Sequence, residues 1–219
     1  MDKEISSVVI RKFQTGDRDE VRRIVCATAM MGEPCHRFFD GDEVFADAIS
    51  RYFTDHEPES IYVAQVNATV IGCVFGAKDV AVMSKIFGEK LALWLVLKAL
   101  KQGVFYKKKN IIFFGKCLWG AIQGEFRCPD LTKEYPAVVH INIKEGYRGL
   151  DIGSRLMHAY LEYLKGAHVR GVHLATMSDK AGNFFAQNGF KLLFSGKRSY
   201  FRHILYKDVP LYMYGLKLK

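Results

Sequence analysis

The stretch from Ala137 to Leu164 constrains the fold more than any other part of the chain. Residues 137–143 read Ala-Val-Val-His-Ile-Asn-Ile, a β-branched and apolar run that predicts a buried strand. A helix ending at Gly166 is predicted by four apolar residues at intervals of four, namely Ile152, Leu156, Tyr160 and Leu164. A strand that passes through a short turn into a helix directs several free N–H groups, and the positive end of the helix dipole, to one point. The segment therefore suits a phosphate group.

The turn itself reads Arg148-Gly149-Leu150-Asp151-Ile152-Gly153, which resembles the Q/R-x-x-G-x-G/A loop of the GNAT superfamily of N-acetyltransferases. Residues 172–176, Val-His-Leu-Ala-Thr, resemble the next strand of that family. The stretch from Ser178 to Phe190 resembles its N-x-x-A-x-x-F-Y-x-x-x-G-F segment through Ala181, Phe184, Gly189 and Phe190. The resemblance covers roughly residues 137–194, and the ordered series of elements makes it stronger than the loop alone.

The resemblance implies an α/β chain with the GNAT (acyl-CoA N-acyltransferase) fold, a mixed central sheet with helices on both faces. It implies acetyl-CoA (coenzyme A) as co-substrate and an acetyl or acyl group moved to an amine. The backbone of Ile141, Asn142 and Ile143 would pair with the pantetheine amides. The pyrophosphate would bind the loop residues Arg148, Gly149, Leu150, Asp151, Ile152, Gly153 and Ser154, and two further cofactor contacts are expected at Ser178 and Phe185.

Three positions depart from the family pattern. Asp151 stands where the family has its first loop glycine, Ser178 where it has asparagine, and Phe185 where it usually has the tyrosine that protonates the leaving thiolate. These departures leave a second interpretation open, a catalytically degenerate GNAT domain that binds CoA or acyl-CoA as a sensor or structural module.

Candidate catalytic residues come from the central strand and the C-terminal part of the chain. His140 and Asn142 share one face of the predicted strand, and a histidine with a pKa near neutral suits general-base work. The alternative for His140 is a hydrogen-bonded core histidine. Because a phenyl ring at Phe185 cannot donate a proton, the candidate acids are Tyr200, Tyr206 and a bound water, and the thiolate leaving into solvent unaided is a further alternative. Of these, Tyr200 is the candidate catalytic residue.

The remaining elements are read from periodicity and turn residues. Strands are expected near residues 8–13, 61–66, 70–77, 172–177, 190–194 and 211–216, with short helices at 181–188 and after Asp17. Asp17 and Glu20 have the spacing of a capping box. A helix begins near Asp42, and the nearby acids Asp40, Asp42 and Glu43 either meet an amine or cap and solvate the helix.

Residues 79–136 have no counterpart in the compact family pattern and are interpreted as a basic, partly helical insertion in one domain spanning 1–219. This segment has ten lysines and arginines against five acids, so it carries +5 of the net charge of +9. Leu91, Trp94, Leu95 and Leu100 predict a packed apolar side, with Lys90, Lys98 and Lys101 exposed. The basic side is either a solvated face or a lid or partner surface.

The composition limits the cellular compartments and the binding partners that we expect for this protein. The five cysteines form no C-x-x-C pair, so neither a disulfide framework nor a metal site is expected, and a cytoplasmic location fits best. The run from Leu91 to Leu97 is far shorter than the roughly 20 residues of a membrane span. The positive charge favours anionic partners. We expect a small-molecule or peptide amine as acceptor, regard nucleic acid as unlikely because no aromatic-basic surface is evident, and leave a homodimer open.

Overall fold

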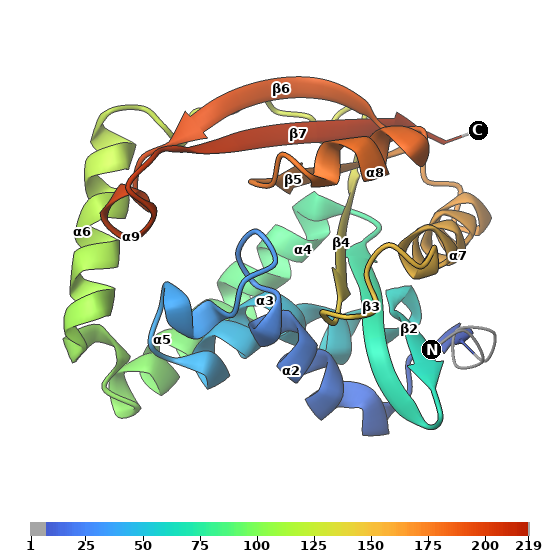
Figure 1. The fold of residues 1–219 in the computed structure, drawn as a ribbon, viewed down its shortest axis with the longest axis horizontal. Coiled ribbons are helices and arrows are strands. Elements are labelled where there is room, and N and C mark those ends of the chain that lie inside the picture. The colour runs from blue at the N-terminus through green and yellow to red at the C-terminus, as the bar shows by residue number, and fades with distance from the viewer. Residues whose placement is uncertain (1–7, 219) are drawn as a thin grey trace.

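The computed structural model describes residues 8–218, and Figure 1 shows their arrangement. Seven strands occur in the described part of the chain: β1 (Val9–Lys12), β2 (Tyr62–Val66), β3 (Thr69–Ala77), β4 (Ala137–Ile143), β5 (Gly171–Thr176), β6 (Lys191–Arg198) and β7 (Val209–Lys217). The α-helices are α2 (Arg18–Ala27), α3 (Asp42–His56), α4 (Val80–Ile86), α5 (Ala92–Lys101), α6 (Lys108–Ile122), α7 (Ile152–Gly166), α8 (Ala181–Gln187) and α9 (Arg202–Leu205). Short 3-10 turns lie at Thr15–Asp17, Cys35–Arg37, Pro58–Ser60 and Val104–Tyr106, and a π-helical turn at Phe87–Leu91 joins α4 to α5.

The strands form one mixed sheet in the order β1-β2-β3-β4-β5-β7-β6. All neighbouring pairs are antiparallel except β4 and β5, which are parallel. A parallel pair needs a crossover, and α7 supplies it. The mixed sheet with helices on both faces confirms the predicted fold class.

Alternation along the strands divides the core into two layers. On one face, Leu156, Tyr160 and Leu164 of α7 pack with Val139 of β4. On the other face, the apolar side of α2 and α3 packs with Phe75 of β3, and Val138 lies against this layer. Successive strand residues point to opposite faces, so β4 serves both layers at once.

A close approach fixes α7 against the sheet. The Tyr160 hydroxyl donates a hydrogen bond of 2.8 Å to the carbonyl oxygen of Val138. A Cβ atom on Gly76 would lie 1.9 Å from that oxygen and 2.3 Å from the Tyr160 hydroxyl. Only glycine therefore allows β3, β4 and α7 to meet at this point.

The predicted boundaries of the central segment agree with the structure, because β4 spans 137–143 and α7 ends at Gly166. The hairpin turn is shorter than predicted: Asn67 and Ala68 have φ of 46° and 65°, and Thr69 already belongs to β3. The predicted capping box was wrong. Asp17 is the N-cap residue of α2, but its carboxylate bonds no N–H of that helix. It accepts hydrogen bonds from the Arg11 side chain of β1 and from the Gln14 N–H, which closes the preceding 3-10 turn.

The segment between β3 and β4 is largely helical. Leu91 and Leu95 are buried, as predicted. Two details of the prediction were wrong: Leu100 is 44% exposed, and Lys98 is not free in solvent but pairs with Asp47 of α3. Both errors arise because α5 is apolar on nearly all sides, so its sequence does not mark the side that packs.

Candidate active site

The central opening of the sheet is the gap between β4 and β5. The two strands pair only at Ala137 with Val172 and at Val138 with His173. Beyond these residues they diverge, as Figure 1 shows, and residues 139–143 have no partner on β5. An unpaired strand edge offers backbone N–H and C=O groups to an extended ligand that itself contains amides. Ile141, Asn142 and Ile143 lie on this edge.

The loop after β4 ends in the N-terminus of α7. Arg155 is the first residue whose N–H bonds within the helix, to the Asp151 carbonyl at 3.1 Å. The N–H groups of Ile152, Gly153 and Ser154 therefore have no hydrogen-bond acceptor among residues 8–218. Three free N–H groups and the positive end of a 15-residue helix form a site suited to an anion.

The two loop glycines are required for different reasons. Gly149 has φ of 78°, a left-handed conformation that disfavours a side chain, although the space around it is open. Gly153 is buried, and a Cβ there would lie 3.0 Å from the Phe184 ring and 3.3 Å from the Ile143 side chain. A substitution at Gly153 would thus disturb packing as well as any ligand.

Asp151 and Arg148 occupy the outer part of the loop. Asp151, with φ of 57°, is the N-cap residue of α7, and its side chain is exposed and makes no capping hydrogen bond. Arg148 donates hydrogen bonds of 3.1 Å to the carbonyl oxygens of Ile143 and Gly32. Arg148 thereby joins the end of β4 to the loop between α2 and α3.

His140 and Asn142 share one face of β4, as predicted, and this face meets α2 and α3. The Asn142 amide donates a hydrogen bond of 2.8 Å to the hydroxyl of Thr28, at the end of α2. The His140 ring stacks on Phe75 at 5.4 Å and meets Phe53 edge-on at 5.9 Å. Thr28 was not predicted, since nothing in the local sequence indicates a contact with a strand 114 residues away.

The environment of His140 favours its neutral form. Desolvation, with a smaller effect from His173, lowers the pKa of the His140 imidazole to about 4. Protein atoms surround the ring deeply, yet the residue is exposed, and water screens part of this effect. His140 is therefore neutral and accessible near pH 7, which is the state a proton acceptor requires.

The other predicted site residues lie elsewhere. The Tyr200 hydroxyl donates a hydrogen bond of 3.4 Å to the Met177 sulfur, and burial raises the Tyr200 pKa to about 12, so the phenol keeps its proton. Phe185 is 6% exposed and packs with Phe190 and Tyr214 in the core. Ser178 follows β5 and donates its backbone N–H to the Thr176 hydroxyl.

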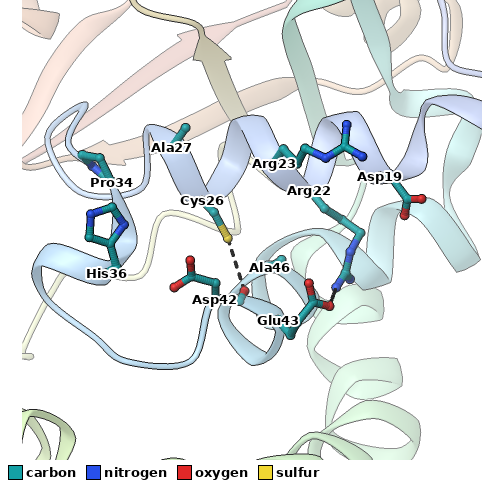
Figure 2. Close-up of a pocket in the computed structure, with 10 residues that line it drawn as sticks. All are labelled: Asp19, Arg22, Arg23, Cys26, Ala27, Pro34, His36, Asp42, Glu43 and Ala46. Atoms are coloured by element: carbon teal, nitrogen blue, oxygen red, sulfur yellow. Dashed lines mark hydrogen bonds and ion pairs between the residues drawn. The ribbon is translucent and has the colours of Figure 1, made fainter.

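A separate groove of about 600 Å³ lies between α2 and α3 and is shown in Figure 2. Two of the three acids expected to meet an amine, Asp42 and Glu43, line it. Glu43 pairs with Arg22, the Asp42 carboxylate accepts from the Cys35 thiol at 3.3 Å, and Asp40 pairs with Lys109 outside the groove. All three acids are therefore held by the chain's own groups. The opening at β4 and β5, where free backbone groups converge, is the better candidate for chemistry.

Within the described residues, no group of three or more His, Cys, Asp and Glu side chains is arranged to hold a metal ion. The parallel strand pair that opens beside a helix N-terminus instead defines a site built mainly from backbone. Such a site fits an extended ligand with amides and phosphates.

Comparison with known proteins agrees with this description. Residues 27–190 match the family model described as the acetyltransferase (GNAT) family. The chain therefore belongs to the GNAT acetyltransferase family. No curated protein matches the chain.

Solved structures share the fold at low sequence identity. The SsHAT crystal structure is 21% identical with a TM-score of 0.70, covering 97% of this chain and 99% of that one. The polyamine N-acetyltransferase of Drosophila melanogaster, an enzyme that forms N-acetylagmatine, is 14% identical with a TM-score of 0.62, over 96% and 100% of the two chains. The yncA protein of Salmonella typhimurium, solved with its cofactor acetyl-CoA, is 11% identical with a TM-score of 0.57, and the match covers 97% of this chain and 95% of that one. At these identities the likeness shows the fold.

Proposed function

We propose that this protein transfers the acetyl group of acetyl-CoA to the amine of a small molecule or peptide. The observation that carries the proposal is the parallel pair β4–β5, which opens after Val138 beside three free N–H groups of α7. This arrangement suits the parts of coenzyme A in the right order along one path: thioester and pantetheine amides on the strand edge, pyrophosphate at the helix.

The residues present fit such a ligand. The free edge of Ile141 to Ile143 would hold pantetheine, and an N–H of this edge would donate to the thioester oxygen as charge develops on it. The N–H groups of Gly153 and its neighbours would hold the pyrophosphate. Arg148 keeps the loop against the end of β4 through its bond to the Ile143 carbonyl. Asp151 places a negative charge near the phosphates, which weakens binding without blocking it.

The reaction needs a proton acceptor and a proton donor. In our proposal the neutral His140 takes the proton of the amine, directly or through water, while the amine nitrogen attacks the thioester carbon. Asn142, fixed by Thr28, lines the same face and orients the acceptor. As the carbon–sulfur bond breaks, the thiolate takes a proton from water, because the Tyr200 hydroxyl is buried and bonded to the Met177 sulfur. Phe185 takes no part, because its ring is buried and has no hydroxyl.

The test of the cofactor site uses Asp151→Asn. Asparagine keeps the shape and tolerates the left-handed backbone, but removes the charge. A unit charge near the pyrophosphate at the surface is worth about 1 kcal/mol, so acetyl-CoA should bind about fivefold more tightly to the variant. S-acetyl-pantetheine, which lacks the pyrophosphate, is the matched control and should bind both proteins equally. Equal tightening for both ligands, or none, would place the phosphates elsewhere.

The test of turnover is thiol release from acetyl-CoA with a broad panel of amines. Release that depends on the amine and falls in His140→Gln supports the proposed transferase. Tight calorimetric binding of acetyl-CoA without release from any amine would favour the alternative, a catalytically degenerate domain that binds CoA or acyl-CoA as a sensor or structural module. The observation that supports this alternative is the buried phenyl ring of Phe185, which stands in place of the family's tyrosine.

A further inference from the structure

The solvent side of the inserted helices is apolar, opposite to the usual pattern of a surface helix. On α5 the exposed apolar side chains are Leu93 (68% exposed), Val96 (46%), Leu97 (56%) and Leu100 (44%). Their spacing of i, i+3, i+4 and i+7 places them in one stripe. The opposite side of α5, with Leu95 and Ala99, is buried against the rest of the protein.

The same pattern continues on α6, which Figure 1 shows along one side of the molecule. Its most exposed apolar side chains are Ile111 (55% exposed), Leu118 (66%), Trp119 (57%) and Ile122 (70%). Its other side carries Phe113 and the buried Asn110, whose amide donates to the Val104 and Asp40 carbonyls. Thus both helices are held firmly by one side and present apolar side chains to solvent on the other.

The exposed charges between Val80 and Ile122 are positive with one exception. Six exposed lysines lie on the inserted helices and the turns that join them, Lys85, Lys90, Lys101, Lys107, Lys108 and Lys116. None of the six forms an ion pair with another described residue, whereas Lys98 and Lys109 are turned inward to pair with Asp47 and Asp40. Glu89 is the one exposed acid between Val80 and Ile122.

An apolar surface bordered by unpaired lysines favours one kind of binding partner over the others. A second copy of the chain would bring the same unpaired lysines face to face. A nucleic acid would satisfy the lysines but leave the leucine and tryptophan side chains without a partner. An anionic lipid surface meets both requirements, since the headgroups attract lysines and the acyl boundary accepts Leu, Ile and Trp side chains.

We propose that α5 and α6 form a docking surface for an anionic lipid bilayer. The helices lie in the plane of the interface, with Leu97, Leu118 and Trp119 inserted at the level of the headgroups and the six lysines above them. No helix in the described part of the chain is long and apolar enough to cross a membrane, and docking of this kind needs none. The proposal is independent of the acetyl-transfer proposal.

The test is co-sedimentation of the full chain with phosphatidylcholine vesicles, with and without phosphatidylserine. The wild-type protein should bind only the phosphatidylserine vesicles, and high salt should weaken binding. Lys101→Gln with Lys108→Gln should lose about thirtyfold in affinity, since each lysine near an anionic surface is worth about 1 kcal/mol. Lys191→Gln with Lys197→Gln, exposed lysines on β6, is the matched control and should bind as the wild type.

A second pair of variants tests the apolar contact. Leu97→Gln with Leu118→Gln should lose at least about tenfold in affinity, while Val9→Gln with Leu192→Gln, exposed on β1 and β6, should lose none. All of these positions are exposed, so circular dichroism and thiol release from acetyl-CoA should be unchanged. Equal binding by the patch variants and their controls would overturn the proposal. So would an absence of vesicle binding together with a dimer that the leucine variants dissociate, which would assign the surface to a second copy.

Discussion

Replacing Asp47 by asparagine tests what holds α5 against α2 and α3. The Asp47 side chain on α3 is 5% exposed and pairs with Arg22 of α2 and with Lys98 of α5. Removing the charge leaves two cations, 15% and 21% exposed, beside each other without their shared partner. Loss of one member of a buried ion pair costs about 3–5 kcal/mol. Glu43 can approach both cations, so we expect the free energy of unfolding to fall by about 3 kcal/mol, the lower end of that range.

Glu43→Gln is the matched control in the same cluster. Glu43 pairs with Arg22 and lies 3.9 Å from Lys98, but its side chain is 67% exposed, so its loss should cost about 1 kcal/mol or less. The measurement is urea unfolding monitored by circular dichroism, with the same m-value for all variants. Lys98→Met should partly restore the Asp47→Asn protein, because it removes one unpaired cation. Equal losses for Asp47→Asn and Glu43→Gln would refute the argument from burial.

Three further predictions concern single residues. Gly76→Ala should destabilise by about 3 kcal/mol or more in urea unfolding, since its Cβ would lie 1.9 Å from the Val138 oxygen, and a loss below about 1 kcal/mol would contradict the close approach of Tyr160 to this point of the sheet. Because the pKa of His140 is lowered, its proton resonances should not titrate between pH 8 and 5.5 and should move only below about pH 5. The contribution of neutral His140 to the free energy of unfolding is complete above its unfolded pKa near 6.5, and it is lost as the pH falls toward 4. Phe185→Tyr should leave thiol release roughly unchanged. It should lower the free energy of unfolding by about 1–3 kcal/mol, since the new hydroxyl would be buried without a hydrogen-bond partner. A large gain in turnover would show that the ring reaches the thiolate.

The sequence alone was sufficient for elements built from local pattern. The run 137–143, the turn and the four-residue spacing up to Leu164 define β4, the loop and α7 because period, turn residues and helix ends are properties of neighbouring residues. The resemblance of residues 148–153 to the GNAT loop predicts a phosphate site in the same segment, and that site stays a prediction.

Contacts between distant segments were decided only by the tertiary structure. Asn142 contacts Thr28 because the end of α2 packs on β4, and Lys98 pairs with Asp47 because α5 packs on α3. The residues that flank a charged or polar side chain in the sequence do not indicate which distant residue it will contact.

The side on which α5 packs is the clearest case of this kind. The residues of α5 are apolar around most of its circumference, so periodicity predicts a helix but not its orientation. Burial of Leu95 and exposure of Leu97, two residues apart, are set by the layer of α2 and α3 on one side and by solvent on the other. The same holds for the gap between β4 and β5: each strand's pattern is local, but their divergence after Val138 depends on the whole sheet.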